Sequence, residues 1–309
     1  MILRKLLRLL GHLSWLRFGV RDRVIRFFHN PDKSQSEFFS VPFFGSIYRG
    51  NFNTFIDWSV YYYGAYAYEE LRLFEDFLST FENPTVVDVG ANVGHHTLFA
   101  AMKSGKVICF EPFQDVADRL EQKITDNALS NVYLFKVALG DKNELALYLK
   151  PTGQNTGTGS FSSVNPKGDT LTLPVRVGDE ILAENNISSV HFIKIDTEGF
   201  EPFVLSGLRN TIERNRPLVF FEWTQEEKKN SRDNFTELFP VNYNFFNFIS
   251  DTPTFVFFRK PAYKLEKLNG KWPDGNLFAV PDEFIQKLKN TNPMCSAGKQ
   301  IFSALNLRS

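Results

Sequence analysis

The sequence predicts an α/β protein built around a mostly parallel β-sheet. Short runs of β-branched and apolar residues alternate with helical patterns between residues 85 and 222, and such alternation is typical of parallel strands joined by right-handed helical crossovers. The first strand leads directly into a glycine-spaced turn at residues 90–94, and acidic residues stand at the ends of later strands. A glycine turn between a strand and a helix is a feature of Rossmann-like folds that bind nucleoside-containing ligands.

The leader, residues 1–28, combines many leucines with seven basic residues and one acid, Asp22. It lacks the ~18 uninterrupted apolar residues of a spanning helix. Because Arg8 interrupts the apolar run and no small-residue cleavage site follows, it is a poor match to a signal peptide. Two interpretations stay open. The leader is an amphipathic helix that packs on the body or in an oligomer interface, or a helix that lies on an anionic membrane surface.

A polar, turn-rich stretch at residues 30–36 links the leader to an aromatic segment over residues 38–68, and residues 69–81 read as a helix that ends at Asn83-Pro84. The aromatic segment is a candidate for substrate binding, although core packing explains most of its rings.

The core pattern follows in regular order. Strands are expected over residues 85–89, 106–110, 132–138, 190–195 and 218–222, and helices over residues 93–102, 116–129 and 201–214. Residues 145–149 and 171–177 alternate with a period of two, so we expect them to pair as an added hairpin or edge. The Gly-, Ser-, Thr- and Asn-rich loop between them, residues 152–168, is a second candidate for substrate binding. Closing antiparallel strands are expected over residues 245–249, 254–258 and 276–280.

This pattern predicts a basic leader and linker over residues 1–36 and one domain over residues 37–309. Within that domain we expect an N-terminal cap over residues 37–82, a ligand-binding core over residues 83–225, and C-terminal strands and a tail over residues 226–309.

Charge and cysteine content narrow the class of protein. With 35 basic and 35 acidic residues the chain is formally neutral, so no overall positive field favours nucleic-acid binding. Cys109 and Cys295 are the only cysteines, and Cys109 falls within a predicted buried strand. A disulfide framework is therefore not expected, and a reducing compartment is favoured. We expect a cytoplasmic protein, with peripheral membrane contact left open by the leader.

Two acids frame the glycine turn. Asp88 precedes the turn and Glu111 ends the next strand, where an acid takes ribose hydroxyls in nucleoside-binding folds. A dinucleotide site has the pattern G-x-G-x-x-G, so that a pyrophosphate lies on the helix N-terminus. Here Asn92 stands where a middle glycine would be, and Asp88 would repel a pyrophosphate. The turn therefore favours a ligand with positive charge and no phosphate, such as S-adenosylmethionine, over NAD.

A second charged cluster follows the strand that ends at Ile195. Lys194, Asp196, Glu198 and Glu201 gather within eight residues, and the carboxyl ends of strands are where open α/β sheets bind ligands. A helix-capping role explains Glu201 well and Asp196 poorly. Glu222 ends a neighbouring strand and is expected to face the same crevice.

These segments together resemble the FkbM family of S-adenosylmethionine-dependent methyltransferases. The resemblance covers roughly residues 66–223 and rests on the turn from Asp88 to Gly94, the pair Glu111-Pro112, the loop at residues 155–160 and the segment KIDTEGFE that begins at Lys194. It implies the class I methyltransferase fold, a seven-stranded sheet with helices on both faces and an antiparallel last strand. It also implies methyl transfer to a hydroxyl oxygen of a sugar, glycan or other small-molecule acceptor. His95-His96 is an unusual continuation, and we assign these imidazoles no role.

The resemblance assigns candidate roles to individual residues. Asp88, Gly90, Asn92 and Gly94 are expected to hold the amino acid end of the cofactor, Glu111 its ribose, and the backbone at Ala138 to border the adenine. Transfer to a hydroxyl requires a base or a metal. Asp196 is the first candidate for the base, with Lys194, Glu198 and Glu222 as supporting charges. A hard divalent ion can bind such carboxylates, but no spacing demands one. The rival interpretations are a nicotinamide dehydrogenase and a non-catalytic protein on the same fold.

Overall fold

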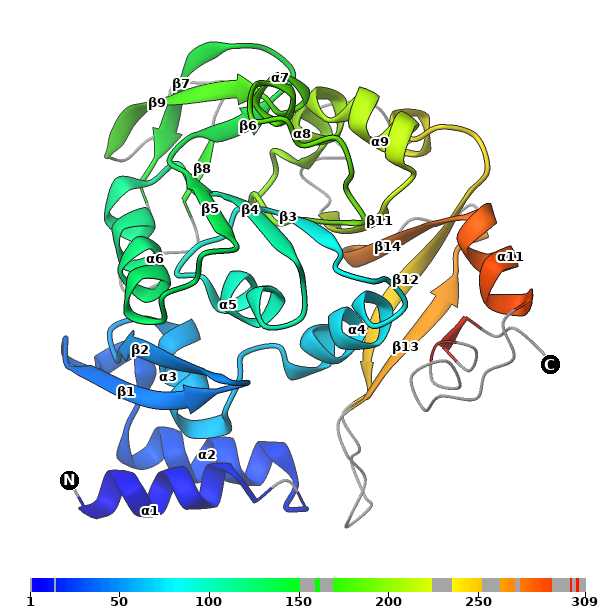
Figure 1. The fold of residues 1–309 in the computed structure, drawn as a ribbon. Coiled ribbons are helices and arrows are strands. Elements are labelled where there is room, and N and C mark those ends of the chain that lie inside the picture. The colour runs from blue at the N-terminus through cyan, green and yellow to red at the C-terminus, as the bar shows by residue number, and fades with distance from the viewer. Residues whose placement is uncertain are drawn as a thin grey trace.

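An eight-stranded sheet forms the centre of the computed structural model (Figure 1), in the order β13-β12-β14-β11-β10-β3-β4-β5. The structure describes residues 2–13, 15–150, 159–161, 169–223, 235–251, 262–269, 273–290, 301, 304 and 305. Five neighbouring strands run parallel, namely β11 (Leu218–Trp223), β10 (Phe192–Ile195), β3 (Thr85–Val89), β4 (Lys106–Phe110) and β5 (Val132–Phe135). The predicted parallel sheet is thus confirmed.

The remaining strands of the sheet are antiparallel to their neighbours. β14 (Gly275–Pro281) is inserted between β11 and β12 (Tyr243–Asp251), and it runs antiparallel to both. β13 (Ala262–Lys267) pairs antiparallel with the outer edge of β12, so the described sheet has one strand more than the seven expected. The predicted strand at residues 254–258 lies outside the described residues.

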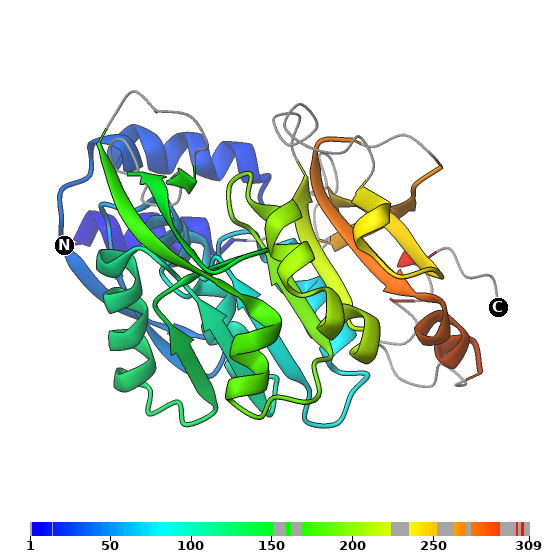
Figure 2. The same cartoon turned by 90° about the horizontal axis from the view of Figure 1, so that it is seen from above.

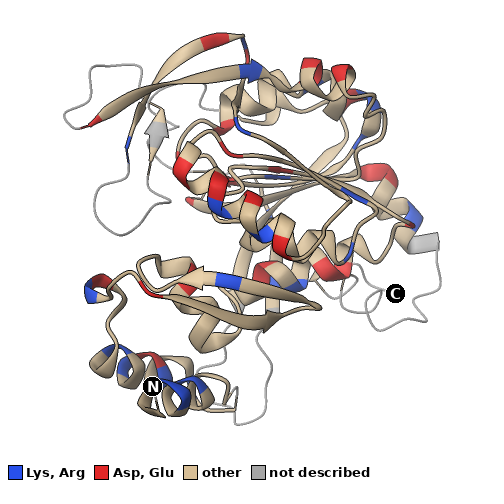
Figure 3. Cartoon of the chain, turned by 60° about the vertical axis from the view of Figure 1, so that its left-hand side comes forward, with Lys and Arg blue, Asp and Glu red and all other residues tan. Residues whose placement is uncertain are grey.

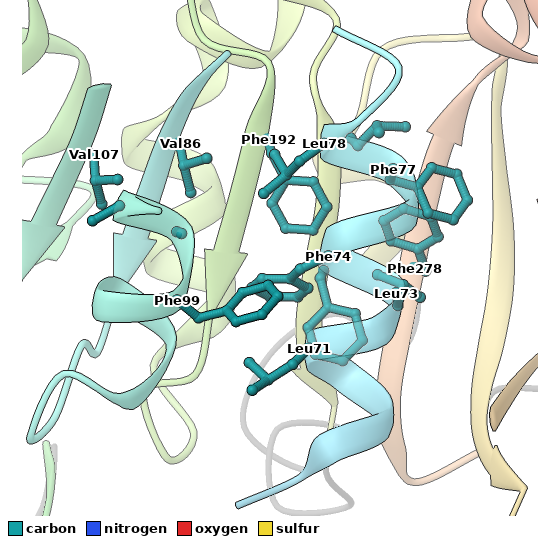
Figure 4. Packing of buried hydrophobic residues seen from close by; sticks show 14 of the residues in the cluster. Leu71, Leu73, Phe74, Phe77, Leu78, Val86, Phe99, Val107, Phe192 and Phe278 are labelled. Carbon is teal, nitrogen blue, oxygen red and sulfur yellow. The ribbon is translucent and has the colours of Figure 1, made fainter. Parts of the chain in front are cut away.

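Helices cover both faces of the sheet (Figure 2). One face carries α4 (Tyr68–Leu78), α5 (His95–Ala101), α6 (Gln114–Asp126) and α11 (Asp282–Asn290), and the other carries α7 (Gly178–Glu184), α8 (Glu201–Gly207) and α9 (Arg209–Asn215). Because side chains alternate along a strand, Val86 contributes to one core and Val87 to the other. Figure 4 shows Phe74 and Phe77 of α4 lying against Phe192 and Phe278 of the sheet.

Three predicted elements differ from the structure. The third strand is split, since residues 138–140 leave β5 and form β6 (Ala138–Gly140), which pairs with a second sheet. The helix expected over residues 201–214 is two helices, α8 and α9, where Gly207 crosses β6 so closely that a Cβ atom would lie 1.9 Å from the carbonyl oxygen of Gly140. The helix after the glycine turn begins only at His95, because Gly90, Asn92 and Gly94 all have positive φ.

A four-stranded second sheet stands beside the carboxyl ends of the parallel strands. It has the order β6-β9-β7-β8, with β7 (Glu144–Leu149) and β9 (Thr170–Val177) antiparallel as predicted and with β8 (Ser160–Phe161) at its edge. Most of the loop expected at residues 152–168 lies outside the described residues, so its predicted role in acceptor binding stays a prediction.

An N-terminal layer packs against the sheet domain from the side of α5 and α6. It contains α1 (Ile2–Gly11), α2 (Phe18–Phe28), the short 3-10 helix η1 (Pro31–Lys33), the hairpin of β1 (Phe38–Phe43) and β2 (Ser46–Asn51), and α3 (Phe55–Tyr63). The leader is therefore two helices rather than one. Most of the aromatic residues here are core, as Tyr48, Phe52, Trp58 and Tyr62 are almost fully buried. Within the described residues no helix is long and apolar enough to cross a bilayer.

A buried ammonium joins this layer to the glycine turn. Lys123 of α6 donates to the carbonyl of Val93 (2.7 Å) and lies 3.5 Å from the carboxylate of Asp57 in α3. It also lies 4.3 Å from the centre of the Tyr48 ring, and the Tyr48 hydroxyl donates to Asp57 (2.6 Å). Burial lowers the pKa of Lys123, and the Asp57 carboxylate opposes that effect. A charge so deeply buried needs such partners.

Replacing this lysine tests the junction. Lys123→Met leaves Asp57 buried without its counter-charge and Val93 without its donor, so we expect the free energy of unfolding to fall by about 3 to 5 kcal/mol. Urea denaturation measures the change. Lys136→Met, which removes two ion pairs at the surface, is the matched control and should have little effect. Equal stability of the two variants would contradict a stabilising role for the contacts of Lys123 with Val93 and Asp57.

Candidate active site

A cavity lies at the carboxyl ends of β3, β4, β10 and β11, closed on one side by the N-terminal layer and on the other by the second sheet. Its lining includes Gly90, Asn92, Glu111, Ala138, Asp196, Glu198 and Glu222, together with Phe55, Tyr66, Glu70, His96, Tyr148, Phe161, Phe200 and Asn276. Seven of the ten predicted site residues therefore meet in one cavity. Asp88, Gly94 and Lys194 are not part of the lining.

The glycine turn is shaped by contacts within the protein. At Gly90, where φ is +75°, a Cβ atom would lie 1.8 Å from the backbone oxygen of Asp196. At Gly94, where φ is +84°, a Cβ atom would lie 2.3 Å from Leu120. The sequence suggested that both glycines admit a ligand, whereas the structure shows the protein chain itself filling the space beside each. Their predicted contact with the cofactor stays a prediction.

Glu111 is held by the backbone of two turns. Its carboxylate accepts the N–H groups of Asn92 and Phe113, both at 2.9 Å, and Asn92 adopts the left-handed conformation, with φ of 51°. Burial raises the pKa of Glu111 to about 7, against the lowering effect of those two hydrogen bonds. Two amide donors do not exhaust the acceptor sites of a carboxylate, so Glu111 retains the capacity to accept hydroxyl groups from the cavity.

Lys194 is buried below the cavity and contacts both the glycine-turn segment and the segment that follows β10. It faces Asp88 directly in the register of β10 and β3. Its Nζ atom lies 3.3 Å from the Gly90 carbonyl, 3.3 Å from Asp196 and 3.5 Å from Asp88. Burial lowers the pKa of Lys194, but the carboxylates of Asp196 and Asp88 outweigh it and raise the pKa overall. Lys194 is therefore a permanent cation. Asp88 also accepts the hydroxyl of Thr97 (2.6 Å).

Glu201 organises the turn that follows β10. Its fully buried carboxylate accepts the N–H of Thr197 (2.5 Å), the hydroxyl of Thr197 (2.8 Å) and the N–H of Gly199 (3.0 Å). These donors belong to the turn before α8, and no described side chain caps that helix, so the helix-capping role expected of Glu201 is not observed. In this turn the side chain of Asp196 is 47% exposed and lines the cavity. The backbone of Glu198 adopts the left-handed conformation, with φ of 53°.

Two glutamates share the cavity with Asp196 and are harder to ionise than usual. Burial, followed by repulsion from Asp196, raises the pKa of both Glu198 and Glu222 to about 7. The lining holds five carboxylic acids and, among its described residues, no lysine or arginine. The cavity is therefore suited to a neutral or cationic ligand and unsuited to a phosphate.

Several lining residues were not predicted. Glu70 of α4 accepts the side-chain amide of Asn276 in β14 (2.9 Å), and its carboxylate lies 3.0 Å from Nε2 of His96, although the angle between them does not make a hydrogen bond. His95 is turned away from the cavity, where its Nε2 accepts the backbone N–H of Tyr66 (3.1 Å) and burial lowers its pKa. His96 was visible in the sequence next to Gly94, whereas no local pattern singles out Glu70 or Asn276.

The metal question was left open by the sequence. In the part of the chain that the structure describes, no group of three or more His, Cys, Asp and Glu side chains is arranged to hold a metal ion.

The comparison with known families agrees with the motifs in this cavity. The sequence profile of the methyltransferase FkbM domain matches residues 88–249, more than half of the chain. The chain belongs to the FkbM methyltransferase family. The sheet of this FkbM protein has the class I methyltransferase arrangement, with β14 as the antiparallel last strand and β13 as an added edge.

Curated relatives of this FkbM protein act on sugars or carry an O-methyltransferase name. It is 29% identical over 133 residues to the hexuronic acid methyltransferase AglP of Haloferax volcanii, a match that covers 43% of the chain and 53% of the relative. It is 23% identical over 175 residues to the 2-O-methyltransferase NoeI of Sinorhizobium fredii, covering 51% and 71%. The chain thus spans about half the length of the first relative.

Solved structures that resemble the chain include an FkbM methyltransferase from Methylobacillus flagellatus. That structure has a TM-score of 0.41 at 17% identity and covers 64% of this chain and 44% of its own. An O-methyltransferase from Bacillus cereus in complex with SAH has a TM-score of 0.39 at 14% identity, with coverages of 69% and 79%.

The close approach of the two FkbM motifs gives a direct test. Gly90→Ala adds a Cβ atom against the Asp196 carbonyl, whereas Gly199→Ala adds one in open space, and both positions have positive φ. We expect Gly199→Ala to cost about 1 to 2 kcal/mol from backbone strain alone and Gly90→Ala to cost clearly more. Thermal and urea unfolding measure both. A similar loss in the two variants would contradict the contact between Gly90 and Asp196.

Proposed function

We propose that this protein is an S-adenosylmethionine-dependent O-methyltransferase that acts on a hydroxyl group of a neutral sugar. The observation that carries the proposal is a cavity with five carboxylic acids and no described lysine or arginine, built by the two FkbM motifs. NAD carries a pyrophosphate, which such a cavity would repel, whereas the sulfonium and ammonium groups of S-adenosylmethionine are attracted to it. A nicotinamide dehydrogenase is therefore disfavoured.

The residues of the cavity fit the cofactor. Glu111 lines the cavity, and its carboxylate can still accept hydrogen bonds from two ribose hydroxyls. Gly90 and Asn92 line the space beside it. Ala138 also lines the cavity, and we assign it to the wall beside the adenine. Asp88 lies behind this surface, where it supports Lys194 and, through Thr97, the start of α5. When bound, the cofactor supplies a methyl group on a positively charged sulfur.

The acceptor hydroxyl must lose its proton as the methyl group arrives. We propose that Asp196 accepts this proton. Its side chain is half-exposed at the cavity, the Lys194 ammonium lies beside it, and the turn that carries it is held by hydrogen bonds to Glu201. Glu198 and Glu222 add negative charge to the cavity once they ionise, and that charge attracts the positively charged methyl donor. Alignment of the hydroxyl with the methyl group supplies much of the rate.

A sugar is the acceptor class that the walls favour. The cavity is lined by the aromatic rings of Phe55, Tyr66, Tyr148, Phe161 and Phe200, whose flat apolar faces suit a sugar ring. The name of AglP points to methylation of a hexuronic acid, and that of NoeI to methylation of an oxygen. The acidic lining favours neutral sugars over uronic acids, because it repels the carboxylate of a uronate but not a neutral hydroxyl. We therefore place a neutral sugar ahead of a hexuronic acid for this chain.

Titration calorimetry tests the cofactor. We expect S-adenosylmethionine to bind and NAD not to bind, and Glu111→Gln to weaken S-adenosylmethionine binding by about 10- to 100-fold, since hydrogen bonds to a charged group are lost. Glu213→Gln, at an exposed position on α9, is the matched control and should bind as the wild type does. Binding of NAD alone would overturn the proposal.

Transfer of a labelled methyl group tests the acceptor and the base. Neutral glycosides should be methylated in preference to uronates, and Asp196→Asn should lower kcat by about 100- to 10,000-fold while the variant still binds the cofactor. Because Glu198 and Glu222 become ionised only as the pH rises through about 7, the rate of the wild type should rise with pH across this range. Removing Glu198 removes a repulsion that raises the pKa of Glu222.

The methylation rate of the Glu198→Gln variant should therefore reach its plateau at a lower pH than the rate of the wild type. Full turnover in Asp196→Asn would remove Asp196 from the role of base. Cofactor binding without transfer to any hydroxyl would instead favour the non-catalytic interpretation.

A further inference from the structure

The first two helices of the N-terminal layer, α1 and α2, expose an unusual amount of apolar surface. Eleven large hydrophobic side chains are exposed in α1, α2 and the turn between them, against eight in the rest of the described chain. Those of α1 and its end are Ile2, Leu3, Leu6, Leu9 and Leu13, and those of the turn and α2 are Trp15, Phe18, Val20, Val24, Phe27 and Phe28. Extended patches of this kind mark interaction sites.

The packing of α1 does not account for these residues. The helix contacts the body through Leu7, which is buried with Ile25, Trp58 and Tyr62. Gly11 crosses α3 so closely that a Cβ atom would lie 2.1 Å from the Tyr62 carbonyl. The face that packs on the protein is therefore already satisfied. Leu6 and Leu9 lie outside this contact, with 57% and 65% of their surface exposed, where a helix packed on a protein body is normally polar.

Basic residues surround this apolar surface. The two helices and their turn contain seven basic residues and one acid in a chain with no net charge, and Figure 3 shows blue segments gathered on the helices beside the N-terminus. Some of these cations hold the layer together, because Arg4 donates to Glu37, Arg21 to the Gly11 carbonyl, and Arg26 to Asp22. Lys5, Arg17 and Arg23 are exposed. Exposed apolar side chains among cations match the surface of an anionic bilayer.

The layer also adjoins the candidate active site. A cavity of about 490 Å³ lies between the N-terminal helices and the start of α4, lined by Gly11, His12, Phe18 and Arg21 on one side. Phe55 and Tyr66 line this cavity and the candidate active site alike. A surface bound to α1 and α2 would therefore lie next to the acceptor side of the site.

We propose that the layer of α1 and α2 docks this protein on anionic lipid bilayers. The exposed leucines and phenylalanines enter the interface, and Lys5, Arg17 and Arg23 meet the headgroups. A second copy of this chain fits the same surface less well, because two such layers in contact would bring their cations together. The docking does not depend on the identity of the methyl acceptor.

Vesicle sedimentation of the full chain tests the proposal. We expect binding to vesicles of equal parts phosphatidylcholine and phosphatidylglycerol, little binding to phosphatidylcholine alone, and weaker binding as salt is raised. Leu6→Ser with Leu9→Ser should weaken binding by about tenfold or more. Leu145→Ser with Val241→Ser removes two apolar residues elsewhere that are even more exposed and should leave binding unchanged. Lys5→Glu with Arg23→Glu should weaken binding, unlike Lys142→Glu with Arg214→Glu.

Unchanged thermal unfolding of the variants shows that any loss of binding comes from the surface. Equal binding by the leucine variant and its control would overturn the proposal. So would a wild-type dimer that ignores vesicles and dissociates on Leu6→Ser with Leu9→Ser, since that result makes the layer an oligomer interface.

Discussion

The site is organised around one buried ammonium. Lys194 lies beneath the cavity with almost no contact with water, so its charge is tolerated only because Asp88, Asp196 and the Gly90 carbonyl surround it. These partners belong to the two segments that define the family pattern. The parallel register of β3 and β10 brings Lys194 beside Asp88, and the approach of Asp196 to Gly90 leaves no room for a side chain there. The two motifs are thus a single packed unit.

This unit explains why the cavity can concentrate acids without losing its shape. The ammonium of Lys194, which pairs with Asp88 and Asp196, is placed below the surface, while the turn that carries Asp196 and Glu198 is held by backbone hydrogen bonds to Glu201. The shape of this turn therefore does not depend on the ionisation of Glu198. A turn fixed in this way needs no rearrangement during a reaction in the cavity.

Local sequence patterns predicted the parts of this architecture that depend on local chemistry. The strands at residues 85–89 and 106–110 have the predicted bounds because β-branched runs and a following turn determine them. Glu111 and Asp196 were found because a strand end places its next side chain at the sheet edge. Glu70 and Asn276 could not be found in this way, since they join the cavity only when α4 covers the sheet and β14 inserts between β11 and β12. The split of the third strand is similar, because its second half pairs with β9, a strand much later in the chain.

The contact of Lys123 with Val93 has a thermodynamic consequence. The same ammonium contacts α3 through Asp57 and the glycine turn through the Val93 carbonyl, so a movement of either segment changes the environment of one buried charge. Where a ligand at the turn strengthens this contact, linkage requires that a change in the N-terminal layer alters ligand affinity by the same factor. The ammonium of Lys123 is thus a physical route by which the N-terminal layer and the glycine turn can be coupled.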